Sequence, residues 1–163
     1  MLLAPPPVAG ASRIRAIDGG LLIQSADEGW DEEAWTVATE RTPSATELSA
    51  LHLAWRVAKH ATSNAVVIAN GNGTVGIGAG QPSRVDSCRI AIERARAFGL
   101  PTAGTAAGSD AFFPFPDGVE TLAAGGVTAI AQPGGSLRDA EVIAAANRLG
   151  IAMVLTGRRH FRH

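Results

Sequence analysis

The sequence predicts a layered α/β domain built on a mixed sheet, and three observations support this. Segments with helical periodicity alternate along the chain with short apolar runs, which is typical of α/β layers. Two of these runs are separated only by the turn Asn70–Gly73, which predicts an antiparallel hairpin and therefore a mixed sheet. The chain has 163 residues, of which 46% are hydrophobic and 18% charged, so one domain with one core is expected.

Composition excludes several classes of protein. The net charge of −1 argues against general binding of nucleic acid or other polyanions. The single cysteine, Cys88, rules out an internal disulfide and fits a reducing compartment. No apolar run approaches the length of a membrane span, and the N-terminus lacks the basic and apolar regions of a signal peptide. We therefore expect a cytoplasmic protein with no membrane partner.

The N-terminal part differs from the rest of the chain. Residues 1–41 are expected to form an arm that contains one short strand, Gly20–Gln24. Trp30 and Trp35 flank an acidic segment and are interpreted as anchors that tie the arm to the body. Residues 42–163 are expected to form the compact domain.

The first element of the compact part is a helix that follows Ser44. Ser44 and Glu47 have the spacing of a capping box. The expected apolar face of this helix is formed by Leu48, Leu51, Trp55 and Ala58. The elements expected after it are strands 65–69 and 74–77, a helix from 83 to 98, a helix from 117 to the Gly125-Gly126 pair, strand 127–130, a helix from 137 to 149, and strand 151–155.

The stretch Ser109–Asp117 is the strongest candidate for a binding site. It holds three of the five phenylalanines, together with two prolines and two acids. Asp117 begins a helical pattern in which Glu120 has capping-box spacing. A carboxylate at the start of a helix, beside an apolar wall, suits a ligand pocket. A core loop followed by a helix N-cap would give the same pattern, so both interpretations stay open.

Two weaker candidates precede that stretch. Gly76–Arg84 is a glycine-rich loop between a strand and a helix, where backbone N–H groups can hold an anion. It lacks the Gly-Lys-Ser/Thr ending of a Walker loop and a third glycine of the dinucleotide fingerprint, so a structural turn is an equal alternative. Asn64 precedes a buried strand and either caps a turn, which is the favoured interpretation, or contacts a ligand.

Two basic groups are further candidates. Lys59 and His60 are adjacent near the end of the first helix, but neighbouring helical residues point about 100° apart. Basic residues at that end also favour the helix dipole, so a structural role is preferred. The tail Arg158–His163 either binds phosphate or lies solvated. We expect it to be ordered and folded back toward residues 109–117, with Phe161 as its apolar anchor.

Several chemistries lack their motifs. The sequence has no His-x-Glu with Pro-Cys-x-x-Cys, which excludes a zinc deaminase. One cysteine and four scattered histidines predict no metal site. There is no Gly-x-Ser-x-Gly motif, so a serine hydrolase of that type is excluded.

Five motifs occur together and in order along the chain: Ser63–Val66, Gly76–Arg84, Ser109–Phe115, Gln132–Ser136 and Arg159–His163. Together they resemble the C-terminal part of the bifunctional purine enzyme AICAR formyltransferase/IMP cyclohydrolase, where AICAR is aminoimidazole carboxamide ribonucleotide. The resemblance covers nearly the whole chain. It implies a cytidine-deaminase-like, three-layer α/β/α fold without the deaminase zinc. It also implies a site for 10-formyltetrahydrofolate, as co-substrate, and AICAR where two subunits meet.

The resemblance implies a folate side and a nucleotide side for this site. On the folate side, Asp117 resembles the acid that contacts the pterin, and the pocket would be lined by Pro114, Phe115 and the backbone around Val85.

On the nucleotide side, Arg84, Phe112 and Arg159 resemble the family's nucleotide-binding residues, with Arg159 facing the phosphate. Asn64 resembles a polar residue near the transferred formyl group and is the one candidate catalytic residue.

The departures from the family pattern are large. The cyclohydrolase domain and the first half of the formyltransferase domain are missing, and that half carries the Lys-His pair of the proton chemistry. We therefore expect little activity from this chain alone. It is either one part of a split formyltransferase, a non-catalytic or repurposed folate- or nucleotide-binding module, or a fragment. A homodimer, or pairing with a chain that carries the missing half, is expected. Binding of a monovalent cation is left open, because Ala61 and Ala65 replace side chains expected to help.

Overall fold

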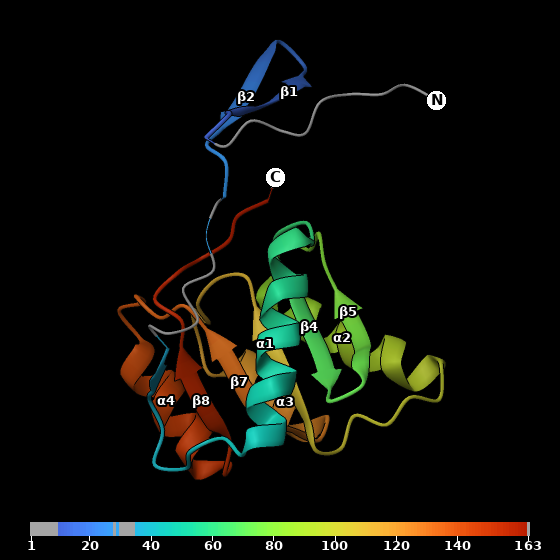
Figure 1. Cartoon of the computed structure of the whole chain (residues 1–163), viewed down its shortest axis with the longest axis vertical. Coiled ribbons are helices and arrows are strands. Elements are labelled where there is room, and N and C mark those ends of the chain that lie inside the picture. Colours follow the sequence, from blue (N-terminus) through green and yellow to red (C-terminus); the bar gives the residue numbers. More distant parts are fainter. Residues whose placement is uncertain (1–9, 28, 30–34, 163) are drawn as a thin grey trace. The chain divides into compact units, whose positions relative to one another are not determined.

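The computed structural model describes residues 10–27, 29 and 35–162, in two units, Met1–Trp30 and Asp31–His163 (Figure 1). The described part of the first unit contains an antiparallel hairpin of β1 (Arg13–Ile17) and β2 (Gly20–Gln24). Strand β2 confirms the predicted strand, whereas β1 was not predicted. Trp30, one of the two expected anchors, lies outside the described residues.

The second unit is built on a six-stranded mixed sheet, which confirms the predicted α/β class. Strands β6, β7 and β8 are parallel, whereas β3, β4 and β5 add antiparallel pairings. In spatial order the strands are β3 (Thr36–Val37), β8 (Ala152–Leu155), β7 (Val127–Gln132), β6 (Thr105–Ser109), β4 (Val66–Asn70) and β5 (Gly73–Gly78).

Four helices cover the two faces of this sheet. Helix α1 (Ala45–His60) packs on one face, against β4 and β6 (Figure 1). The other face carries α2 (Arg84–Ala97), α3 (Asp117–Ala124) and α4 (Asp139–Arg148). The alternation of side chains along β4 produces this arrangement, because Val67 contacts the α1 face while Ile68 packs toward α2. None of the helices in the described ranges has the length and apolar character needed to cross a bilayer.

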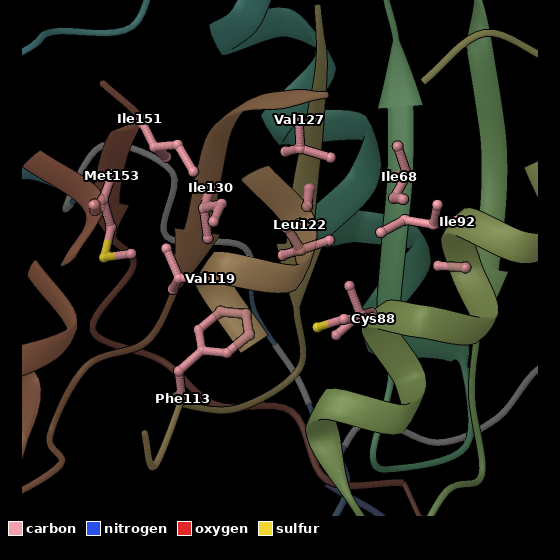
Figure 2. Packing of buried hydrophobic residues seen from close by; sticks show 14 of the residues in the cluster. Ile68, Cys88, Ile92, Phe113, Val119, Leu122, Val127, Ile130, Ile151 and Met153 are labelled. Atoms are coloured by element: carbon pink, nitrogen blue, oxygen red, sulfur yellow. The ribbon is translucent and has the colours of Figure 1, made fainter. Parts of the chain in front are cut away.

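The larger core lies between the sheet and helices α2, α3 and α4. Figure 2 shows its side chains, with Ile130 and Met153 from the sheet on the side of α3, which contributes Val119 and Leu122. Cys88 and Ile92 extend this core along α2. On the opposite face the predicted positions Leu51, Trp55 and Ala58 are buried, whereas Leu48 is 38% exposed and does not belong to the core, contrary to the expected apolar face.

Glycines allow the helices to approach the sheet closely. A Cβ atom at Gly76 would lie 2.1 Å from the carbonyl oxygen of Ala91 in α2, and one at Gly78 would lie 1.9 Å from that of Ser87. Both glycines belong to β5 rather than to a loop. The amide of Gly80, which follows them, donates to Thr62 O at 2.7 Å. These facts favour the structural alternative for the glycine-rich segment over an anion-binding loop.

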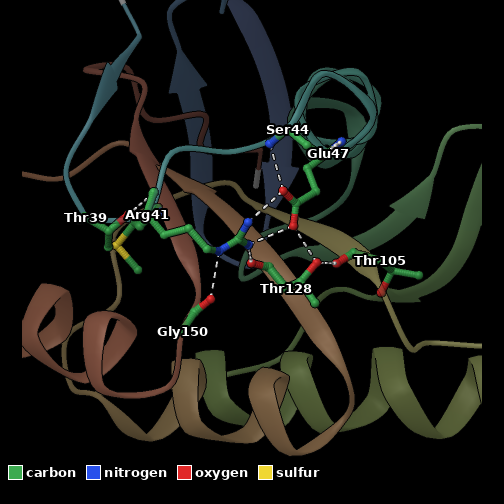
Figure 3. Close-up of polar contacts among 8 residues, drawn as sticks. Thr39, Arg41, Ser44, Glu47, Thr105, Thr128 and Gly150 are labelled. Carbon is green, nitrogen blue, oxygen red and sulfur yellow. Dashed lines mark hydrogen bonds and ion pairs between the residues drawn. The ribbon is translucent and has the colours of Figure 1, made fainter.

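A polar network at the amino ends of the parallel strands fixes the start of α1 (Figure 3). The predicted capping box is confirmed, since Ser44 Oγ accepts from Glu47 N at 3.2 Å and Glu47 Oε2 accepts from Ser44 N at 2.8 Å. Arg41 donates to both Glu47 oxygens at 2.7 and 2.9 Å and to Gly150 O at 2.8 Å. It also donates to the carbonyl of Thr128, the second residue of β7. The hydrogen bond from Arg41 lowers the pKa of Glu47 to about 2.

Strand β6 lies inside the sheet and was not predicted. Its sequence, Thr105–Ser109, contains no large apolar side chain, although every residue is buried. Small residues are required here, because a Cβ at Gly108 would lie 2.5 Å from the backbone nitrogen of Trp55 in α1. Propensity and periodicity therefore carry no signal for this strand.

Candidate functional site

A pocket of about 460 Å³ opens beyond the carboxyl end of β6. The segment 111–115 follows β6 directly and forms one wall. The first turns of α2 and α3 and the C-terminal tail complete it. Crevices outside the carboxyl ends of strands are the usual ligand sites of open α/β sheets. The lining residues are Asn64, Pro82, Ser83, Arg84, Val85, Ala111, Phe112, Phe113, Pro114, Phe115, Asp117, Arg159 and Phe161.

All eight residues that the resemblance implies for the site line this one pocket. They are Asn64, Arg84, Val85, Phe112, Pro114, Phe115, Asp117 and Arg159. They come from four segments that are far apart in the sequence. The structure adds residues to which no site role was assigned, notably Ser83 at the start of α2 and the buried Phe113.

A buried ion pair lies behind the pocket. Arg84, only 7% exposed, donates through Nη1 to the carboxylate of Asp110, which is fully buried. The same nitrogen donates to Ser109 Oγ at 2.9 Å, and Nη2 donates to Asn64 Oδ1 at 2.8 Å. Ser63 Oγ donates to the other oxygen of Asp110 at 2.5 Å. The pair is therefore held by hydrogen bonds on both partners, as a buried charge pair requires.

Arg84 keeps donors that this cluster does not use. A guanidinium has five N–H groups. Three are engaged by Asp110, Ser109 and Asn64. Among the described residues, no acceptor is present for the Nε–H or for the second hydrogen of Nη2. Because Arg84 lines the pocket, these groups are available to a ligand.

The side-chain amide of Asn64 ties down the loop that precedes α2. Its Nδ2 donates to Gln81 O at 2.9 Å and to Pro82 O at 3.2 Å. The amide therefore has a structural role, as the favoured interpretation expected, but it holds a distant loop and does not cap a local turn. Both amide hydrogens are used, so Asn64 can meet a ligand only as an acceptor, through the remaining lone pair of Oδ1.

Asp117 stands at the mouth of the pocket as the first residue of α3. Its Oδ1 accepts from the backbone N–H of Gly118 at 2.7 Å, and its side chain is exposed. The capping box suggested by Glu120 does not form, because the N-cap position is Pro116, whose side chain makes no cap hydrogen bond. The other oxygen of Asp117 has no donor within the described ranges, so it can accept from a ligand.

An aromatic wall separates the Asp117 end from the core. The buried Phe113 is fixed by its backbone N–H, which donates to Gln132 Oε1 at 2.8 Å. Gly118 allows α3 to pack on that ring, since a Cβ there would lie 2.6 Å from Phe113 Cδ1. Phe115 is half-exposed, and the guanidinium carbon of Arg138 lies 4.8 Å from its ring centroid. The aromatic stretch is therefore both core and pocket wall.

The C-terminal tail folds back onto the stretch 109–117, as predicted. The backbone N–H of His160 donates to Asp110 O at 2.7 Å, and Ser63 N donates to the carbonyl of Arg162 at 3.0 Å. The expected anchor is wrong, however. Phe161 is half-buried, whereas His160 is 1% exposed and lies against Trp55, with ring centroids 4.5 Å apart. The imidazole fills the space beside the indole, which leaves Phe161 to line the pocket.

One comparison with known proteins decides the family. Residues 2–94 match the family model described as "AICARFT/IMPCHase bienzyme", a span of more than half of the chain. The chain belongs to the AICARFT/IMPCHase bienzyme family.

Curated relatives of the chain are longer proteins of this family. The chain is 53% identical over 166 residues to the bifunctional purine biosynthesis protein PurH of Chloroflexus aurantiacus, a match that covers 100% of the chain and 32% of that protein. It is 55% identical over 167 residues to PurH of Paracoccus denitrificans, covering 98% of the chain and 32% of that protein. It thus spans about a third of the length of the curated relatives that it matches.

Other candidate groups of this AICARFT/IMPCHase family member lie outside the pocket lining. Lys59 and His60 end α1, and neither lines the pocket. Burial raises the pKa of the Cys88 thiol to about 12, although the nearby charge of Arg84 opposes this, so Cys88 is not a nucleophile near neutral pH. Within the described ranges, no group of three or more His, Cys, Asp and Glu side chains is placed to hold a metal ion.

A larger hollow of about 880 Å³ lies between β5 and α2. Its charged lining side chains, Glu93 and Arg94, are exposed on the outer surface of α2. It contains nothing comparable to the buried Arg84–Asp110 pair. Since binding sites combine an apolar wall with a few convergent polar groups, the smaller pocket is the better candidate.

Proposed function

We propose that this chain is the C-terminal part of an AICAR formyltransferase domain of purine biosynthesis, with a cytidine-deaminase-like fold that lacks the deaminase zinc. Its pocket binds 10-formyltetrahydrofolate and AICAR. The observation that carries the proposal is the convergence of eight residues from four segments on one pocket. The volume of about 460 Å³ is within the range of about 300–1,000 Å³ that small-molecule sites have.

The folate occupies the Asp117 end of the pocket. A carboxylate with a free oxygen can accept from paired N–H groups on the edge of a pterin. The ring lies against the apolar wall of Pro114 and Phe115, and the backbone around Val85 closes the other side. Asp117 therefore orients the folate.

The nucleotide occupies the end where Arg84, Phe112 and Arg159 lie. Arg159 is exposed and meets the phosphate, for which a guanidinium is a good bidentate partner. The unused N–H groups of Arg84 donate to the carboxamide or ribose oxygens. Phe112, half-buried, offers a ring face to the base.

The reaction is acyl transfer from the folate to the amine of AICAR. The amine attacks the formyl carbon and a tetrahedral oxyanion forms. As this intermediate collapses, the bond between the formyl carbon and the folate nitrogen breaks, the attacking nitrogen loses a proton, and the leaving folate nitrogen gains one. Asn64 lines the pocket beside Arg84 and can accept a hydrogen bond from the attacking amine through the remaining lone pair of Oδ1, which orients the amine. This chain supplies positioning, whereas the Lys-His pair that the resemblance implies for proton transfer lies outside it.

The test is formyl transfer assayed with this chain alone and after mixing with a chain that carries the remainder of a PurH relative. The chain alone, which we expect to form a homodimer or to pair with a chain that carries the missing half, should show little or no turnover. The mixture should restore turnover. Turnover by the isolated chain would contradict this division of labour and would return attention to Lys59 and His60.

A second candidate is a non-catalytic module that binds a folate or a nucleotide. The observation in its favour is that the pocket is formed within this chain, which spans 32% of the PurH relative from Chloroflexus aurantiacus. Such a module would bind either ligand but would give no turnover with the complementary chain.

A further inference from the structure

We propose that Asp110 is a positioning residue that sets the orientation of Arg84 and anchors the backbone beside Arg159, on the nucleotide side of the pocket. The identity of the ligand rests on the proposed function, whereas these two effects rest on contacts within this chain. Asp110 is absent from the pocket lining, so it acts through Arg84 and Arg159 rather than on a ligand.

The first part of this role concerns the carboxylate. One oxygen of Asp110 accepts from Arg84 Nη1, and the other accepts from Ser63 Oγ at 2.5 Å. With Ser109 and Asn64, the carboxylate engages the Nη groups of a planar, rigid guanidinium. Because the guanidinium is planar and rigid, these hydrogen bonds at the Nη groups also fix the direction of the Nε–H and of the second N–H of Nη2 in Arg84.

The second part concerns the main chain of Asp110. Its N–H donates to Ala65 O at 3.1 Å, which fixes it to the segment that enters β4. Its carbonyl accepts from the N–H of His160 at 2.7 Å. Arg159 directly precedes His160, so this bond fixes where the Arg159 side chain starts. Asp110 thus holds Arg84 through its carboxylate, and it holds the backbone next to Arg159 through its carbonyl.

Ser63 links the same two parts. Its hydroxyl donates to Asp110 Oδ2, while its backbone N–H donates to the carbonyl of Arg162 at 3.0 Å. The tail, the ion pair and the loop before β4 therefore form one hydrogen-bonded unit. Loss of the Asp110 charge should release Arg84 without disturbing the Asp117 end of the pocket, because in the described structure no hydrogen bond or ion pair joins Asp110 to Asp117.

The experiment compares Asp110→Asn with the wild type in the full chain. Isothermal titration measures the affinity for AICAR and, separately, for 5-formyltetrahydrofolate, a stable reduced folate. The affinity for AICAR should fall by about 10- to 100-fold, the loss expected for a misplaced charged hydrogen-bond donor. The affinity for the folate should change by less than about threefold. The control is Glu47→Gln, which weakens the other arginine–carboxylate pair and should leave both affinities unchanged.

A second readout does not depend on any ligand. In a ¹⁵N–¹H spectrum of the wild type, the Nη1–H group of Arg84 that donates to Asp110 should give a distinct, slowly exchanging signal, assigned by its loss in Arg84→Lys. In Asp110→Asn the signal should broaden or exchange rapidly. If the wild type binds neither probe, the proposed function fails, and this signal still decides the role of Asp110.

Two results would overturn the proposal. One is an Arg84 signal that is unchanged in Asp110→Asn. The other is an equal loss of affinity for both ligands in a folded variant, since that is what a purely structural role would give. If Asp110→Asn does not fold, the milder Ser63→Ala must show the same preference for AICAR loss and the same weakening of the Arg84 signal, or the proposal is rejected.

Discussion

The two ends of the parallel strands each carry an arginine–carboxylate pair, and the two arginines differ in how many of their N–H groups are hydrogen-bonded within the chain. At the amino ends, Arg41 uses four of its five N–H groups on Glu47, Gly150 and Thr128 (Figure 3). At the carboxyl ends, Arg84 uses three, although its side chain is 6% exposed and that of Arg41 is 38% exposed. The donors that Arg84 does not use belong to a residue that lines the pocket. The first pair therefore serves the fold alone, whereas the second keeps donors for the ligand that we propose.

The largest expected effect is on the buried pair. Asp110→Ala leaves the Arg84 charge without its partner and should lower the free energy of unfolding by about 3–5 kcal/mol. Arg41→Met, at the other end, should lower it by about 1–2 kcal/mol, because its partners remain partly solvated. Urea denaturation of both variants measures this difference. Equal losses would mean that burial does not distinguish the two pairs.

The tail sharpens the same contrast, because its described backbone hydrogen bonds to Asp110 and Ser63 lie at the carboxyl end of β6. Deleting residues 160–163 removes the His160–Asp110 and Ser63–Arg162 hydrogen bonds and exposes Trp55, which should cost about 2–3 kcal/mol. His160→Ala should account for more of this loss than Phe161→Ala, since His160 is the buried anchor. Thermal unfolding of the three variants checks the order, and an unchanged melting temperature after the deletion would defeat it.

The smallest effect is a pH dependence at the amino ends. The pKa of Glu47 is lowered to about 2 by Arg41, below the ordinary value of 4.5. A depressed carboxyl pKa contributes stability that is present above pH 4.5 and is lost as the pH falls toward 2. Glu47→Gln, which should cost about 0.5–1.5 kcal/mol at pH 7, should therefore approach the wild-type stability as the pH falls through this window. A difference that stays constant from pH 7 to pH 3 would show that the charge of Glu47 is not responsible.

The sequence predicted elements that neighbouring residues determine, such as a helix cap, better than elements that packing against distant residues determines. The capping box of Ser44 and Glu47 formed, because serine can accept from the backbone there. The same spacing failed at Asp117, because Pro116 occupies the N-cap position and its side chain has no acceptor. Strand β6 gave no signal, since helix α1 packs directly on Gly108 and demands small residues.

The site shows the same limit. The family resemblance implied residues that line the pocket, because its motifs carry the site residues of the family. Asp110 was visible only as an acid beside the aromatic stretch. Its partner Arg84 is 26 positions away, and only the pairing of β4 with β6 brings the two together. Likewise, the sequence favoured a structural role for the amide of Asn64, but only the structure identifies its two loop carbonyl acceptors, which follow it by 17 and 18 positions.

The most direct test of the central claim is a pair of binding titrations on the isolated chain, with AICAR and with 5-formyltetrahydrofolate, in the wild type, Arg84→Lys and Asp117→Asn. Lysine keeps the charge but loses the planar fork, and asparagine loses one acceptor and the charge. Arg84→Lys should weaken AICAR more than the folate, and Asp117→Asn should weaken the folate more than AICAR, each by about 10-fold or more. The assignment of this pocket would be contradicted if neither substitution changed the affinity for either ligand. It would also be contradicted if the wild type failed to bind either ligand.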